Sequence, residues 1–98
     1  MDMQFYFDGS IPQQVVSDLM VLLEDMFRKC PSDSALTVSL LAVGGKMCAD
    51  VSLRSAALQF KESLECRTLE SLKTSMCRLF KNRVSTWRRS ETEDEVAL

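Results

Sequence analysis

The amino-acid sequence predicts an α+β protein in which one four-stranded sheet carries two helices on a single face. Three observations support this prediction: segments with strand character near the N-terminus and between residues 35 and 64, two segments with apolar residues at helical spacing, and the pair Gly44-Gly45 between two strand-like segments. The element order is β-α-β-β-β-α. Because two amphipathic helices must each cover an apolar stripe, we expect both to pack on the one apolar face of the sheet.

The first predicted elements are a strand and a helix. Residues 3–7 alternate between apolar and polar side chains, as a half-buried strand does. Ser10 and Gln13 form a capping-box pattern, and Pro12 is expected in the first turn of the following helix, where its missing N–H costs little. Apolar residues then recur at helical spacing up to Phe27, and Cys30 ends the helix because a residue before proline avoids the α region.

Three strands are predicted next. Residues 35–43 are rich in β-branched and apolar side chains, and Gly44-Gly45 supplies the positive φ values of a tight hairpin. Residues 47–54 and 58–64 each alternate between apolar and polar side chains. The outward-facing residues of the sheet should therefore form a polar surface, on which Tyr6 is exposed.

A long helix is predicted over residues 67–89. At about 100° per residue, its apolar residues project onto one side, namely Leu69, Leu72, Met76, Leu79, Phe80, Val84 and Trp87. We expect Trp87 to cover the core rather than to stack on a nucleobase. Residues 90–98 have nothing to bury and are expected to form a mobile acidic tail, so the single domain spans residues 1–89.

Composition excludes several classes of function. The chain has 98 residues, 46% of them hydrophobic and 27% charged, which suits one globular domain and argues against global disorder. No apolar run approaches the roughly 20 residues that cross a bilayer, and a signal peptide is not evident, so a cytosolic location is expected. With no histidine and four widely spaced cysteines, the sequence predicts no metal site, no cofactor, no small-molecule substrate and no enzymatic activity.

Charge is distributed unevenly along the chain. The formal net charge is −2, yet residues 66–89 hold seven Lys or Arg and a single acid, Glu70, whereas residues 90–98 hold four acids and no base. On the helical projection, the basic residues lie mostly opposite the apolar stripe. A solvated helix surface would also carry charge, but this asymmetry is typical of polyanion binding. The candidate RNA-binding residues are Arg67, Lys73, Arg78, Lys81, Arg83, Arg88 and Arg89, with Lys46 and Arg54 as outlying candidates.

The sequence of residues 48–84 resembles the ribosome hibernation-promoting factor and ribosome-associated inhibitor A family, also called sigma-54 modulation proteins. The similarity lies in Ala49-Asp50-Val51, in the strand that follows, and in the apolar spacing of the last helix; the proline-started first helix is similar too. The resemblance implies a β-α-β-β-β-α fold and a stress-response factor that binds the small ribosomal subunit and its rRNA, blocking the channel for messenger and transfer RNA.

One alternative remains open from the residues themselves. A protein of this fold could act as an interaction module that recruits another chain through its exposed sheet face or an edge strand, without binding RNA. The two functions differ in their response to salt, because phosphate binding weakens steeply as salt rises and an apolar interface does not.

Overall fold

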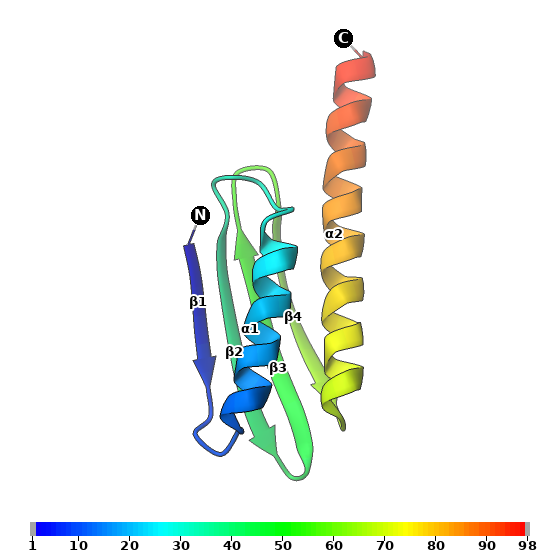
Figure 1. Ribbon diagram of the computed structural model, residues 1–98. Coiled ribbons are helices and arrows are strands. Elements are labelled where there is room, and N and C mark those ends of the chain that lie inside the picture. The colour runs from blue at the N-terminus through cyan, green and yellow to red at the C-terminus, as the bar shows by residue number, and fades with distance from the viewer. Residues whose placement is uncertain (1, 98) are drawn as a thin grey trace.

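The computed structural model describes residues 2–97, with side chains described up to residue 90. The elements are β1 (Asp2–Phe7), α1 (Gln13–Phe27), β2 (Ala35–Val43), β3 (Lys46–Arg54), β4 (Gln59–Cys66) and α2 (Leu69–Ala97) (Figure 1). The predicted α+β class and its β-α-β-β-β-α order are confirmed.

The four strands form one mixed sheet in the order β1-β2-β3-β4. β1 pairs with β2 in parallel, and the α1 crossover between them allows this direction. β2, β3 and β4 form an antiparallel meander. The last pair of residues in the β2–β3 register, next to the turn, is Val43 and Lys46. Gly44 and Gly45 connect these two residues with φ values of 56° and 78°, as a two-residue hairpin of this kind requires.

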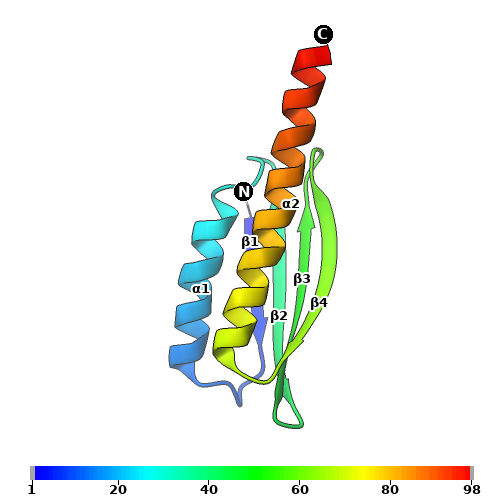
Figure 2. The same ribbon diagram turned by 90° about the vertical axis from the view of Figure 1, so that its right-hand side faces the viewer.

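Both helices cover the same face of the sheet, as predicted (Figure 2). α1 contributes Val16, Leu19 and Leu23 to the core, and α2 contributes Leu72, Met76 and Phe80; all six are buried against inward residues of the strands. Trp87 is half-buried and packs against this core, where it was expected. Cys30 is buried as well, and burial raises the pKa of its thiol, which keeps it in the unreactive protonated form.

The start of α1 differs from the prediction. Pro12 is the residue that precedes the first helical turn, and its carbonyl accepts hydrogen bonds from Val15 and Val16 at 3.0 and 3.2 Å. No side chain caps this end, so the predicted capping box of Ser10 and Gln13 is wrong. The Ser10 backbone N–H instead donates to the Asp8 carboxylate at 3.2 Å, which tightens the turn before the helix.

Both ends of α2 also differ from the prediction. Thr68 caps the helix, because its Oγ1 accepts a hydrogen bond from the Ser71 N–H at 3.1 Å, so the helix begins at Leu69. Arg67 therefore lies in the turn before the helix rather than on it. At the other end, α2 continues to Ala97 instead of stopping near residue 89, and it extends beyond the sheet (Figures 1 and 2). The side chains of residues 91–98 lie outside those described, and the mobility of this tail stays a prediction.

Candidate nucleic-acid interface

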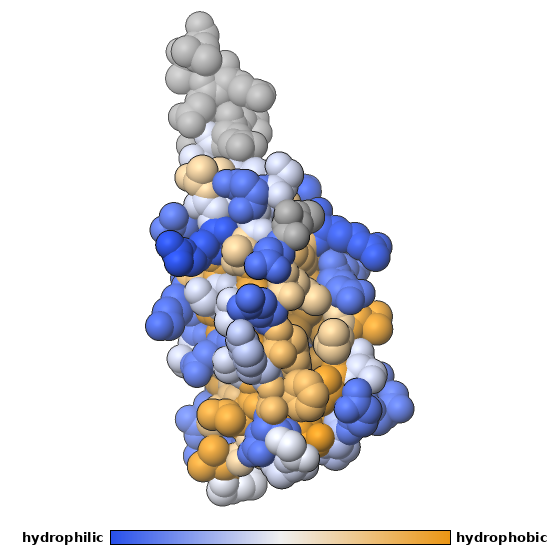
Figure 3. Space-filling view, turned by 90° about the vertical axis from the view of Figure 1, so that its left-hand side faces the viewer, coloured by the Kyte–Doolittle hydropathy of each residue, from blue (hydrophilic) through white to orange (hydrophobic). Residues whose placement is uncertain are grey.

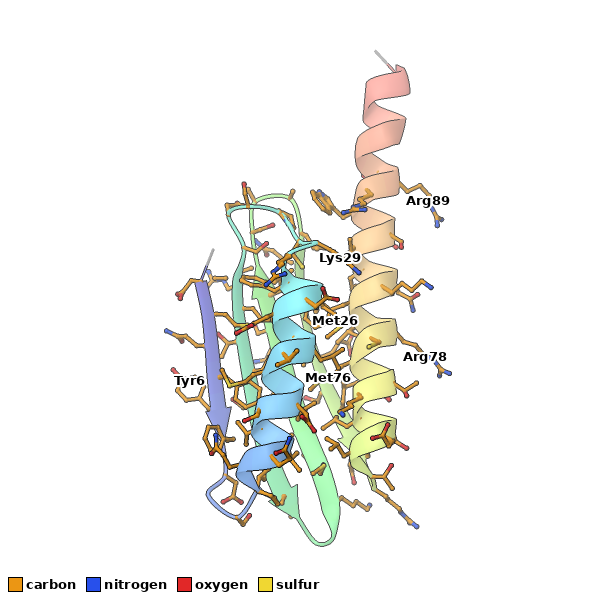
Figure 4. All side chains as sticks on the ribbon, viewed as in Figure 1. Tyr6, Met26, Lys29, Met76, Arg78 and Arg89 are labelled. Atoms are coloured by element: carbon orange, nitrogen blue, oxygen red, sulfur yellow. The ribbon has the colours of Figure 1, made fainter. Side chains whose placement is uncertain are left out.

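Six basic residues are exposed on or next to α2, and Arg83 is one of them. We call the other five the basic face: Arg67, Arg78, Lys81, Arg88 and Arg89. Arg78 and Arg89 are eleven positions apart, which is about three helical turns, and they point the same way, away from the sheet and from α1 (Figure 4). The helical period thus aligns Arg78 and Arg89, whereas Lys81 and Arg88 line a groove beside α1. Arg67 lies in the β4–α2 turn, at the end of α2 opposite to Arg89.

Three other candidates form ion pairs within the chain. The Arg83 guanidinium donates to Glu62 of β4 at 2.7 Å and lies over the Phe60 ring, 5.6 Å from its centroid. Lys46 pairs with Glu65 at 2.9 Å, and this hydrogen bond, with the adjacent charge, raises the pKa of the lysine. Lys73 lies 4.0 Å from Glu70. Pairing reduces the charge that Lys46, Lys73 and Arg83 can offer to an external phosphate.

Arg83 is expected to contribute to the stability of the fold rather than to RNA binding. Replacing Arg83 with alanine removes a half-exposed ion pair and a cation–π contact, so the free energy of unfolding should fall by up to about 1 kcal/mol. Any binding to ribosomes should stay nearly unchanged. Urea denaturation and ribosome cosedimentation measure the two effects, with Arg78→Ala as the matched control. The assignment is wrong if Arg83→Ala weakens ribosome binding as much as Arg78→Ala does.

A groove of about 380 Å³ lies between α1 and α2, and we call it the interhelix groove. Its base is apolar and is formed by Leu22, Met26, Cys77, Phe80 and Val84. Its polar lining consists of Asp25, Lys29, Lys81, Ser85 and Arg88. A shallower hollow that shares Leu22, Cys77 and Lys81 continues the groove toward Lys73 and Arg78. The basic face thus borders an apolar groove lined by more cations than acids.

Lys29 is the residue that the sequence did not single out for this surface. It follows the last turn of α1, and it lines the interhelix groove together with Lys81 and Arg88 of α2 (Figure 4). The sequence does place a lysine just after the end of the first helix, and this was the one sign that Lys29 could contribute charge near a helix end. Its position beside α2 depends on how the two helices pack, which the sequence pattern does not specify.

The opposite face of the sheet is polar, as predicted, and we call it the open sheet face. Arg54 and Lys61 line a shallow hollow there, together with Thr37, Ser39, Asp50, Ser52 and Ser63. Asp50 accepts a hydrogen bond from the Ser63 hydroxyl at 2.6 Å, and Tyr6 donates to Gln4 at 3.2 Å. The outlying candidate Arg54 is therefore separated from the basic face by the full thickness of the domain.

Large apolar residues are exposed at another place, toward the end of β1 and the β2–β3 hairpin. Phe7, Leu41 and Val43 are 44%, 47% and 60% exposed. Figure 3 shows hydrophobic residues gathered over the lower half of the β1 side of the molecule. The candidate Lys46 lies opposite Val43 on this hairpin, but the basic face lies on and next to α2, so this surface provides a separate place where a protein partner could pack.

Within the described residues, no group of three or more metal-ligating side chains comes together. Neither helix of the described chain combines the length and hydropathy of a bilayer-spanning segment.

Two solved bacterial structures resemble this chain. One is a ribosomal subunit interface protein from Coxiella burnetii, with a TM-score of 0.68, 11% sequence identity, and coverage of 91% of this chain and 99% of that one. The other is the N-terminal domain of Thermus thermophilus Protein Y, with a TM-score of 0.63, 14% identity, and coverage of 91% and 98%. The chain shares their fold. No family model and no curated protein sequence matches it.

The similarity extends over nearly the whole of both solved chains, so the complete β-α-β-β-β-α unit is shared rather than a single motif. This confirms the fold that the sequence resemblance implied. At these identities the likeness concerns the fold, and function has to be argued from the surface of this chain.

Proposed function

We propose that this protein is a cytoplasmic, ribosome-associated translation inhibitor that binds rRNA of the small subunit through the basic face and blocks the channel for messenger and transfer RNA. The observation that carries the proposal is the alignment of Arg78 and Arg89 along one exposed side of α2, with Lys81 exposed beside them at the edge of the interhelix groove. The fold shared with a protein named for the ribosomal subunit interface supports the same partner.

The proposed mechanism requires binding and shape but no chemical step. Each Lys or Arg that neutralises a phosphate releases condensed counterions, and this release drives association with RNA. Arginine suits the contact because its planar guanidinium can donate two parallel hydrogen bonds to one phosphate. A folded chain that measures 52 × 22 × 18 Å and is held in this way would exclude other ligands from the volume it occupies.

Cosedimentation of the purified protein with ribosomes at two salt concentrations tests the proposal. If the protein makes five phosphate contacts, its affinity should fall with a log–log salt slope of about −3.5 to −4.5. Recovery in the ribosomal pellet at low salt and loss at moderate salt is the expected result. Absence from the pellet at low salt would remove the support for a ribosomal partner.

A protein-interaction role remains the second candidate, favoured by the exposure of Phe7, Leu41 and Val43 beside the edge strand β1. An edge strand offers unpaired backbone groups to an added strand, and adjacent apolar side chains would add buried area. Binding of this kind should persist at moderate salt. It should also be insensitive to charge reversal on α2.

A further inference from the structure

We propose that the interhelix groove binds the acidic C-terminal segment, residues 90–98, of a second copy of this chain. The inference concerns self-association and goes beyond the proposed function. It combines two features that the RNA proposal does not use: an apolar groove whose charged lining residues are mainly cations, and a helix that carries an acidic segment away from the domain.

The groove has the chemistry to hold an acidic, partly apolar peptide. Its base is formed by side chains that the packing of α1 on α2 leaves accessible at one edge, including Leu22 and Cys77. Lys29 and Lys81 line it from the two helices, whereas Asp25 is the single acid among its lining residues. A peptide there could bury apolar atoms on the base while its carboxylates face cations, which is the usual arrangement of complementary charge around an apolar contact.

The C-terminal segment has the matching sequence. Residues 90–98 read SETEDEVAL, with four acids followed by Val96, Ala97 and Leu98. The acids match the cationic lining of the groove, and the three apolar residues match its base. No other stretch of nine residues in this chain combines four acids with the absence of any base.

The geometry of α2 directs this segment away from its own groove. α2 continues as one helix to Ala97 and extends beyond the sheet (Figures 1 and 2). At 1.5 Å per residue, residue 97 lies roughly 20 Å along the axis from Val84 in the groove base. A straight helix cannot return over that distance to a groove beside itself, so an intact α2 presents the segment to a second molecule.

Occupation of the groove would cover Lys81 and Arg88 and so neutralise part of the charge of the basic face. If the proposed function holds, the self-associated form would therefore bind RNA less well than the monomer, and a high-affinity RNA site would release the segment by competition. This consequence rests on the proposed function, whereas the self-association itself does not.

Analytical ultracentrifugation of the full chain tests the inference. We expect concentration-dependent association at low salt that weakens as salt rises. The groove variant Lys29→Glu with Lys81→Glu and the tail variant Glu93→Lys with Glu95→Lys should each weaken self-association about tenfold or more, because like charges then face each other. Mixing these two variants should restore association, because each groove then meets a segment of opposite charge.

The matched control is Arg54→Glu with Lys61→Glu, which makes the same change in net charge as the groove variant but on the open sheet face. It should associate like the unaltered chain, and circular dichroism should show that all three variants are folded. A chain that stays monomeric up to about 1 mM, the weak end of the affinity scale, overturns the inference. Equal losses in the groove variant and the control overturn it too. A monomer that still cosediments with ribosomes leaves the proposed function intact.

Discussion

Replacing Arg78 and Arg89 with glutamate is expected to weaken ribosome binding by roughly 100-fold at 50 mM salt. The two guanidinium groups point together from one side of α2, so both can contact the same RNA surface. Each phosphate contact contributes about a factor of ten at that salt through counterion release. Reversing the charges also adds repulsion, so 100-fold is a lower estimate. Cosedimentation across a salt series measures the effect, and the log–log slope should become less negative by about 2.

The control for this experiment lies on the other side of the molecule. Arg54→Glu with Lys61→Glu changes the net charge by the same amount, but both residues line the open sheet face. We expect this variant to bind ribosomes almost as well as the unaltered chain. If both double variants lose affinity equally, net charge rather than the basic face controls binding. If only the Arg54 and Lys61 variant loses affinity, the open sheet face is the interface.

The helical period explains why the alignment of Arg78 and Arg89 was predictable. The positions of Arg78, Lys81 and Arg89 relative to the apolar stripe depend only on the rotation per residue, and the stripe was evident because its apolar residues recur at regular spacing. The sheet was predictable for a similar reason, because strand alternation and Gly44-Gly45 are local signals. These features require no knowledge of which elements meet in space.

Contacts between distant elements were not predictable from such patterns. Arg83 lies 21 positions from Glu62, and the two residues meet only because of the position at which α2 packs along β4. Lys29 reaches the groove only because α1 and α2 pack side by side. The parallel pairing of β1 with β2 is likewise a result of the crossover through α1. The sequence therefore predicted the direction of the charges but not which of them are paired.

The extra length of α2 has a related explanation. The apolar spacing in the sequence ends at Trp87, so periodicity offered no signal beyond that residue. The eleven residues that follow contain no glycine or proline, and nothing in them stops a helix that is already formed. The end of this helix was therefore the boundary that the sequence specified least. The observed length of α2 determines where the acidic segment lies relative to the groove.

Phe80→Ala is expected to have the largest effect on stability, lowering the free energy of unfolding by about 3–5 kcal/mol. Phe80 is 2% exposed, and its ring meets Phe60 of β4 edge-on, with the centroids 5.6 Å apart. The substitution would leave a cavity where α2 packs on the sheet and would remove the aromatic pair. Because a domain of this size typically has a free energy of unfolding of about 5–15 kcal/mol, the substitution removes a large share of its stability. Urea denaturation monitored by circular dichroism measures the loss.

The matched control is Val21→Ala, which truncates an apolar side chain of α1 that is 69% exposed and should change stability by less than about 0.5 kcal/mol. Phe80→Ala also bears on function, because α2 is held to the domain by its packing on β4 and α1. If the basic face must be presented by a fixed α2, ribosome binding should fall in parallel with the folded fraction as urea rises. A Phe80→Ala protein that is largely unfolded yet binds ribosomes at full affinity would show that charge alone is sufficient and that the rigid presentation of Arg78 and Arg89 is not required.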